Sequence, residues 1–103
     1  MNTISIFLRV FPQKREEFLQ AVQSLQYDLK QGQGLSSSIL YQDVDDPEQF
    51  HLINEWEKDQ DYDSYLRSEQ FRVLMGALKV LCKETEVRYH MGSQKMGNKV
   101  LEV

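Results

Sequence analysis

Alternation of apolar and polar residues marks a first predicted strand over residues 3–11. Successive side chains of a strand point to opposite faces of a sheet, so residues of one parity share a face. One face of this strand carries Ile4, Ile6, Leu8 and Val10, and the other carries Ser5, Phe7, Arg9 and Phe11. Pro12 has no backbone N–H and ends the strand.

A helix is predicted next, because apolar residues then recur at separations of four, three and four positions. This stripe consists of Phe18, Val22, Leu25 and Leu29. Such spacing places all of them on one face of a helix. Gly32 and Gly34 end the helix.

Two strands are predicted in the middle of the chain, over residues 35–42 and 50–57. Asp45, Asp46 and Pro47 lie between them. These residue types favour a tight turn, so the two strands are expected to form a hairpin.

Two helices and a fourth strand are predicted in the second half. Asp59 is expected to cap a short helix over residues 60–67, and Ser68 to cap a longer one. The longer helix has an apolar stripe made of Phe71, Leu74, Met75, Leu78 and Leu81. Residues 85–91 alternate again and predict the fourth strand.

The order strand, helix, strand, strand, helix, strand is typical of a ferredoxin-like α+β fold. In that fold an antiparallel sheet carries both helices on one face. A length of 103 residues suits one domain. We therefore expect a single domain over residues 1–103, with its core in residues 3–91 and a mobile tail or short terminal strand over residues 92–103.

The second face of such a sheet has no cover within one chain. The expected register places a mixture of apolar and charged residues on it: Phe7, Arg9, Phe11, His51, Ile53, Glu55, Arg88 and His90. A second copy of the chain is the simplest cover, because opposite charges can pair across a two-fold axis. The alternative is a solvated face with scattered apolar residues.

Charge and cysteine content exclude several classes of partner. The 12 basic and 16 acidic residues are interspersed and leave a net charge of -4. No basic stripe is present, so we expect no nucleic acid partner. No stretch approaches the ~20 apolar residues that cross a membrane. Cys82 is the single cysteine, so neither an internal disulfide nor a zinc cluster is expected. These features favour a soluble cytoplasmic protein without a metal site.

One segment carries a family resemblance. Glu55 and Trp56 close the third predicted strand, a short acidic helix follows, and Ser68 and Phe71 form a Ser-x-x-Phe step into the next helix. In these residues the chain resembles the antibiotic biosynthesis monooxygenase family of dimeric α/β barrels. The order of elements extends the resemblance over residues 3–91, and it implies two sheets paired in a homodimer.

The same resemblance has implications for chemistry. Members of the family oxidise phenolic or quinol substrates without metal or flavin, degrade haem, or act on small signalling molecules. Many carry a histidine three residues before the serine, where this chain has Tyr65. Haem-degrading members have a histidine ligand on the second long helix, and residues 69–84 contain none. The resemblance therefore implies neither haem nor another cofactor here, and no activity that depends on that imidazole.

A small-molecule pocket is predicted from the parity of the third strand, because residues 50, 52, 54 and 56 turn toward the helices. Apolar cavities with a few polar atoms are typical of such sites. We assign catalytic roles to Asn54, Trp56 and Tyr65, and substrate contacts to Leu52, Tyr62, Phe71, Met75 and Tyr89. The alternative for Trp56 and Phe71 is ordinary core packing. Asn54 differs, because a buried amide needs a hydrogen-bond partner or a ligand.

Two functions fit these residues. The first is a cofactor-independent oxygenase that acts on a small aromatic, phenolic or quinol-type compound. The second is a non-catalytic dimer that binds a small molecule. A general base is not evident, since the expected register puts His51 and His90 on the opposite face. Isomerisation of a small carbonyl compound would also need an acid-base pair.

Overall fold

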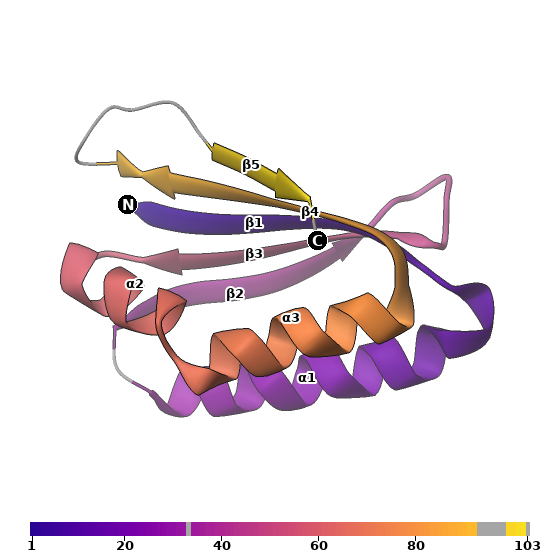
Figure 1. The fold of residues 1–103 in the computed structure, drawn as a ribbon, viewed down its shortest axis with the longest axis horizontal. Coiled ribbons are helices and arrows are strands. Elements are labelled where there is room, and N and C mark those ends of the chain that lie inside the picture. The colour runs from indigo at the N-terminus through magenta and orange to yellow at the C-terminus, as the bar shows by residue number, and fades with distance from the viewer. Residues whose placement is uncertain (33, 93–98, 103) are drawn as a thin grey trace.

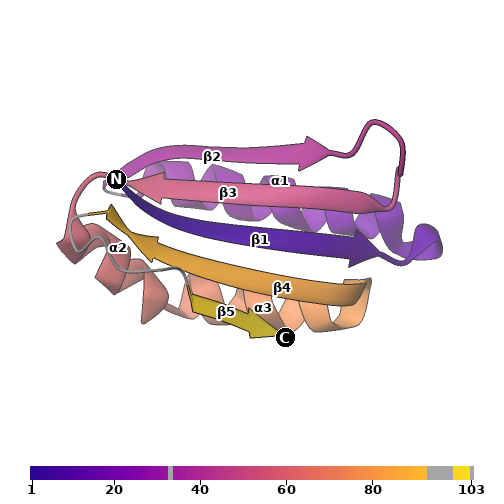
Figure 2. The same cartoon turned by 90° about the horizontal axis from the view of Figure 1, so that it is seen from above.

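The computed structural model describes residues 1–32, 34–92 and 99–102 and has the ferredoxin-like α+β architecture (Figure 1). Antiparallel strands form a five-stranded sheet in the order β2-β3-β1-β4-β5. The view from above shows the helices together beneath one face of this sheet (Figure 2). The elements are β1 Asn2–Val10, a short 3-10 turn Pro12–Lys14, α1 Arg15–Gln31, β2 Leu35–Gln42, β3 Gln49–Trp56, α2 Asp59–Leu66, α3 Glu69–Leu81, β4 Cys82–Met91 and β5 Lys99–Glu102.

The predicted boundaries differ from the observed ones at a few places. Phe11, expected on the uncovered face, lies one residue beyond β1, where its backbone N–H donates to the carbonyl of Leu81. Asp59 is the first residue of α2 rather than its cap, and the preceding residue, Lys58, makes no side-chain cap. β4 begins at Cys82, three residues earlier than expected, because α3 runs directly into it. Residues 93–98 and Val103 of the expected tail lie outside the described residues.

Side-chain parity divides the sheet into a helix-covered face and an outer face, as the alternation predicts. Every even residue of β1 is buried and every odd one is partly exposed from position 3 to position 9. β3 shows the same alternation from Phe50 to Trp56. The apolar core includes the buried even positions of both strands, the inner faces of α1 and α3, Tyr62 and Tyr65 of α2, and Val87 of β4. Burying one large apolar side chain there stabilises the fold by roughly 1.5–3 kcal/mol.

α1 is anchored to the sheet by Phe18, whose ring lies 4.9 Å from the ring of Phe50 on β3. Both side chains are buried.

No helix among the described residues is long and apolar enough to cross a membrane. The helices pack their apolar stripes against the sheet, and no described helix covers its far face.

Ser68 forms the junction between α2 and α3. Its hydroxyl accepts a hydrogen bond from the backbone N–H of Phe71 at 3.1 Å and donates one to the carbonyl of Tyr65 at 2.6 Å. The first bond caps α3, because the early N–H groups of a helix have no partner within it. The second ties the end of α2 to the start of α3. The Ser-x-x-Phe step thus has a structural role at the junction of the two helices.

Gly34 brings the start of β2 against α2. Its φ of 87° lies in the left-handed region, and an added Cβ would clash with the carboxyl group of Asp61. Only glycine satisfies both conditions without strain. The chain just before β2 therefore lies in close contact with Asp61 of α2.

We predict that Ser68→Ala lowers the free energy of unfolding by about 1 kcal/mol, because the capping hydroxyl is lost. The melting temperature should fall by about 4–8 °C in a domain of this size. Thermal unfolding followed by circular dichroism measures the change. Ser24→Ala, on the exposed side of α1, is the matched control and should change the melting temperature little. Equal melting temperatures for Ser68→Ala and the wild type would show that the cap is not needed.

Candidate functional site

An aromatic cluster fills the space between the end of β3 and α2. Trp56 is the last residue of β3 and is 1% exposed. Its ring is stacked on that of Tyr65 from α2, with 4.7 Å between centroids and 29° between planes. Tyr62, one helical turn earlier on α2, meets the Trp56 ring edge-on at 5.8 Å. The structure thus brings together three of the predicted site residues.

The cluster continues outward through α3 to β4. The ring of Phe71 lies 5.4 Å from Tyr65, and the ring of Tyr89 lies 6.4 Å from Phe71. Tyr89 is partly exposed, so the chain of rings runs from the core toward the surface. Met75 packs against the core one turn after Phe71.

Leu52 is separate from this cluster. It is buried on the same face of β3 but lies four residues before Trp56, about 13 Å along the strand at the usual rise per residue. A molecule in contact with Trp56 would need to be long to reach Leu52. Of the predicted contacts, Leu52 has the weakest geometrical support.

Two buried amide oxygens lie beside the aromatic cluster. The Oδ1 atoms of Asn54 and Asn2 are buried and have no hydrogen-bond partner among the described residues, and the two residues are 2% and 1% exposed. Asn54 precedes Trp56 by two positions on the same face of β3, and Asn2 pairs with Trp56 across the strands. A buried acceptor without a partner costs roughly 1–3 kcal/mol. Within the described part of the helix-covered face, these two oxygens are therefore the buried side-chain acceptors that lack a donor.

Asn2 is a buried polar residue beside the candidate site that the sequence reasoning missed. The alternation of β1 extends one residue farther than the predicted strand and gives position 2 the inward parity of Ile4. A polar residue at an inward position is a usable signal, as it was at Asn54. This signal at Asn2 was missed because the strand was predicted to begin at residue 3.

Other buried polar groups near the cluster have partners. The Ser38 hydroxyl accepts a hydrogen bond from the side-chain amide of Gln26 at 3.1 Å. The Tyr62 hydroxyl donates to the carbonyl of Thr3 at 3.5 Å. These groups are structurally satisfied, which distinguishes them from the two asparagine oxygens.

The tyrosines of the cluster remain protonated near neutral pH. Burial raises the pKa of Tyr65 to about 12 and raises the pKa of Tyr62 and Tyr89 as well. A neutral phenol can donate a hydrogen bond but is a poor proton acceptor. The cluster can therefore orient a ligand and exclude water, but none of these tyrosines serves as a base at neutral pH.

The histidines lie on the outer face of the sheet, as the parity predicts. The His51 ring is stacked on the Phe7 ring with 4.0 Å between their centroids. The Arg88 guanidinium lies over the Phe7 ring, 4.6 Å from its centroid. Burial, followed by the charge of Arg88, lowers the pKa of His51. His90 pairs with Thr3 of β1 and shares this face. Neither imidazole is available to the aromatic cluster.

Metal-binding groups are not assembled in the described parts of the chain. No set of three or more His, Cys, Asp or Glu side chains there could hold a metal ion. Cys82 is buried, and burial raises the pKa of its thiol to about 11. At neutral pH this thiol is protonated and therefore a weak nucleophile.

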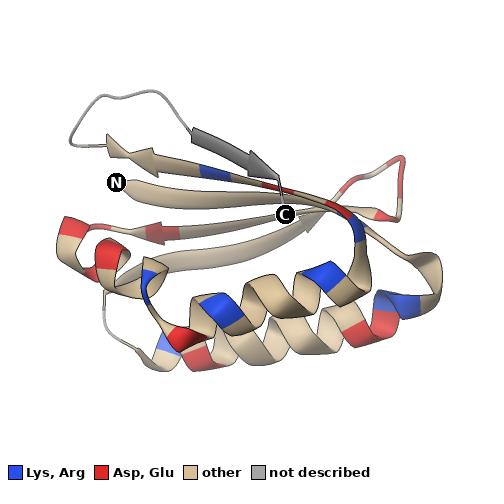
Figure 3. Ribbon diagram, viewed as in Figure 1, with Lys and Arg blue, Asp and Glu red and all other residues tan. Residues whose placement is uncertain are grey.

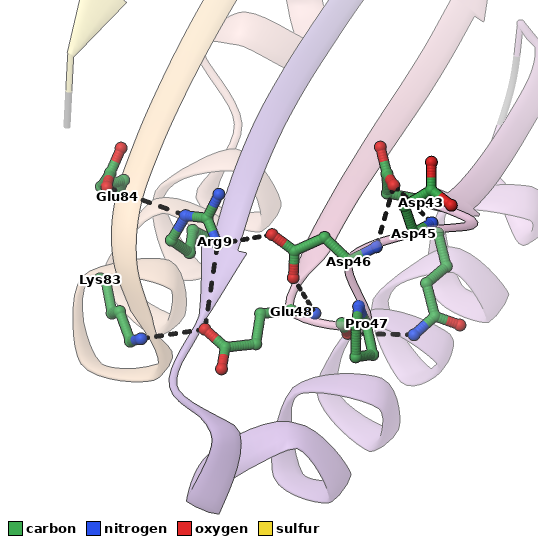
Figure 4. Close-up of polar contacts among 9 residues, drawn as sticks. Arg9, Asp43, Asp45, Asp46, Pro47, Glu48, Lys83 and Glu84 are labelled. Carbon is green, nitrogen blue, oxygen red and sulfur yellow. Dashed lines mark hydrogen bonds and ion pairs between the residues drawn. The ribbon is translucent and has the colours of Figure 1, made fainter.

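A hollow of about 700 Å³ lies at the hairpin end of the outer face. Phe7, Tyr41 and His51 form part of its lining. Arg9 lies at its edge and is held by Asp46 of the hairpin at 2.8 Å, with Glu48 and Glu84 within 4.0 Å (Figure 4). The Arg9 guanidinium is thus paired within its own chain.

Comparison with known proteins supports the fold and the family resemblance carried by residues 55–71. The model of the antibiotic biosynthesis monooxygenase family matches residues 1–77. None of the curated proteins matches the chain.

Solved structures share the whole architecture. A protein from Deinococcus radiodurans that carries the name of an antibiotic biosynthesis monooxygenase has a TM-score of 0.80 at 14% identity, covering 94% of this chain and 97% of that one. One with the same name from Nitrosomonas europaea has a TM-score of 0.76 at 16% identity and 93% coverage of both chains. A conserved protein from Methanosarcina mazei Go1 has a TM-score of 0.72 at 19% identity, covering 99% and 89%. At these identities the likeness concerns the fold alone.

The family match includes β1, the hairpin of β2 and β3, α2 and the Ser68–Phe71 step. It therefore spans the aromatic cluster except for Tyr89, together with the two asparagines whose amide oxygens have no partner among the described residues. Since it covers well over half of the sequence, this chain belongs to the antibiotic biosynthesis monooxygenase family.

Proposed function

We propose that this protein is a cofactor-independent oxygenase that acts on a small aromatic, phenolic or quinol-type compound. The observation that carries the proposal is the unpaired, buried amide oxygen of Asn54 beside the stacked rings of Trp56 and Tyr65. Family membership supports a monooxygenase reaction in general terms. The combination of flat apolar surfaces and one acceptor suits a flat ligand that carries a hydroxyl group.

Oxygenation of this kind makes modest demands on a protein. A hydroquinone or phenol can itself transfer an electron to oxygen, so the site must bind the compound, hold it near oxygen and exclude water. The cluster of Trp56, Tyr62 and Tyr65 is nearly closed to solvent. Asn54 would orient the substrate hydroxyl, and the Tyr65 phenol would donate to a substrate oxygen.

A second candidate function is binding without catalysis. The specific observation in its favour is the lack of a base, because the buried polar residues in the described part of the chain are Asn2, Ser38, Asn54 and Thr85, all uncharged. None of them accepts a proton readily. An enzyme built this way would rely on the substrate or oxygen to take up the proton.

We also propose that the outer face of the sheet pairs with a second copy of the chain. Ile39 and Tyr41 of β2 are 45% and 49% exposed on this face, next to the Phe7–His51 stack. Charged residues lie on the helices, the hairpin and β4, whereas β2 carries none (Figure 3). Exposed apolar side chains on a sheet face favour burial against a partner.

The first prediction concerns activity. Purified protein should increase oxygen uptake with at least one member of a panel of hydroquinones and polyphenols, measured with an oxygen electrode. Asn54→Leu should reduce this rate about tenfold or more, because the orienting hydrogen bond is lost. Trp56→Phe should reduce it less, because one stacking ring is retained. Tyr27→Phe, on the exposed side of α1, is the control and should leave the rate unchanged.

Uptake no faster than in protein-free buffer across the whole panel would contradict the oxygenase. If the same compounds nevertheless bind, the non-catalytic function would be favoured.

The second prediction concerns pH. The Tyr65 phenol has a pKa of about 12 in the folded chain and about 10 when unfolded. Between these values the unfolded chain loses its proton first, so the free energy of unfolding should fall as pH rises through this window. Tyr65→Phe should lose that part of the decline, whereas Tyr27→Phe should retain it. Urea unfolding at several alkaline pH values tests this, and identical pH profiles for wild type and Tyr65→Phe would refute it.

The third prediction concerns assembly. Sedimentation should show a dimer at micromolar concentration, and Ile39→Lys should shift it toward monomer, because an unpaired charge is costly to bury. Val44→Lys is the matched control, since Val44 is 98% exposed in the hairpin turn. Reversal of Arg9 is a poorer probe, because it would first break the intrachain pair with Asp46. Sedimentation of the wild-type protein as a monomer at micromolar concentration would contradict the proposed dimer.

A further inference from the structure

His51 lies in the interior of the outer face of the sheet. Its register partners are Phe7 on β1 and Tyr41 on β2, so a neighbouring strand flanks it on each side. The Phe7 ring is stacked on the imidazole with 15° between the ring planes. The Tyr41 ring lies 6.3 Å from the imidazole, on the side of β2. The imidazole is therefore the middle ring of an aromatic row that crosses three strands.

One nitrogen of this imidazole is buried without a partner. The Nε2 atom of His51 makes no hydrogen bond with the described residues. A neutral imidazole has a single N–H and one acceptor nitrogen, whereas an imidazolium has two N–H donors. Protonation would thus place a charged group here with a donor that has no acceptor, which is costlier than an unpaired neutral group. The surroundings of His51 favour the neutral form.

Arg88 acts in the same direction. Its guanidinium lies over the Phe7 ring, and β1 lies between the strands that carry Arg88 and His51. A like charge disfavours protonation of an imidazole. Burial, and after it the charge of Arg88, lowers the pKa of His51 below its ordinary value of 6.5. The imidazole is therefore neutral at pH 7.

The acidic groups around His51 have other partners. The hollow that His51 lines also contains charged residues from β1, the hairpin and β4: Arg9, Asp43, Lys83, Glu84 and Glu86. Glu86 accepts a hydrogen bond from Arg88 at 3.2 Å. Glu84 lies 3.9 Å from Arg9, and Asp43 accepts two backbone N–H groups within the hairpin. β2 has no charged residue. The described part of the chain thus offers His51 no carboxylate as an ion-pair partner.

The distribution of charge on this face suits a second copy of the chain. The described residues that line its two hollows, of about 700 and 340 Å³, include three basic and three acidic ones. They are Arg9, Lys83 and Arg88, and Asp43, Glu84 and Glu86. A face with both signs in equal number is complementary to a copy of itself, whereas a polyanion would need a surplus of basic residues.

We propose that the outer face binds a second copy of the chain only while His51 is neutral, so that acid separates the two chains. The inference rests on the proposed pairing of the outer faces and adds the protonation state that this pairing needs. A second sheet over the face would remove the remaining water from the imidazole. Protonated rings, one from each chain, would then be buried charges near Arg88. Buried charges without a partner oppose association.

The direction of the pH effect follows from proton linkage. The pKa of His51, already below 6.5 in one chain, should fall further when the second chain covers it. Above pH 6.5 the imidazole is neutral in both states, so the dissociation constant is independent of pH. At lower pH each single chain takes up a proton that it must release to pair. Two protons leave per pair, so the dissociation constant should rise by up to about 100-fold per pH unit.

Sedimentation equilibrium at constant ionic strength between about pH 5 and pH 8 tests the inference, because histidine is the side chain that ordinarily titrates there. The dissociation constant of the wild-type protein should be constant above about pH 7. It should rise at least about tenfold between pH 7 and pH 5. Circular dichroism at each pH checks that the chain remains folded. Nuclear magnetic resonance of the imidazoles should show a lower pKa for His51 at high protein concentration than at low concentration.

Variants assign the effect to one residue. His51→Phe keeps a ring against Phe7 and cannot be protonated, so its dissociation constant should be the same at every pH. His51→Gln serves the same purpose if the phenylalanine variant does not fold. His90→Gln is the matched control, because His90 is the second of the two histidines and shares the outer face. It should retain the rise in acid. His51→Lys should sediment as a monomer throughout.

A wild-type dissociation constant that stays level or falls in acid would overturn the inference. Acid dissociation of His51→Phe or His51→Gln as steep as that of the wild type would do the same. A pKa of His51 that rises on pairing would show that a carboxylate of the partner receives the imidazolium, which also contradicts it. A wild-type monomer at every pH would contradict the proposed pairing as well, whereas a pair of constant affinity contradicts the proton linkage alone. Oxygen uptake tests the oxygenase independently of both.

Discussion

The alternation of β1 is the constraint on which the rest of the structure depends. This strand lies in the middle of the sheet and pairs with both β3 and β4. A slip of one residue would turn its apolar even positions toward the uncovered face and its polar odd positions into the core. Because such a slip would expose these apolar side chains to water, their burial fixes the register of β1 with both neighbouring strands. Through that register, Asn54 and Trp56 face the helices and His51 faces away.

The helix-covered face shows why burial decides the chemistry of the candidate site. Apolar side chains and aromatic rings exclude water there, which raises the pKa of Tyr65 and leaves two amide oxygens without donors among the described residues. A charged residue would be far more costly than an amide in this environment. The polar groups of the candidate site are therefore amides and neutral phenols rather than strong acids or bases.

The outer face differs from the helix-covered face because charged and aromatic side chains lie together on it. Arg88, Phe7 and His51 are layered across three adjacent strands, and the apolar side chains of β2 extend this surface. Pairing of Arg9 with Asp46 ties the hairpin to β1 within the chain. The proposed pairing of two copies on this face would leave the aromatic cluster on the other face uncovered.

The sequence alone determined the order of elements, the parity of the central strands and the association of Trp56, Tyr65 and Phe71, because each depends on local periodicity or on the Ser68 cap. It also identified Asn54 as a buried amide that needs a partner. Only the tertiary structure decided that Asn2 lies beside Trp56, that Asp59 takes its nitrogen, and that Leu52 stands apart. These features depend on which residues of distant strands and helices meet, and side-chain periodicity within one element carries no information about its neighbours across the sheet.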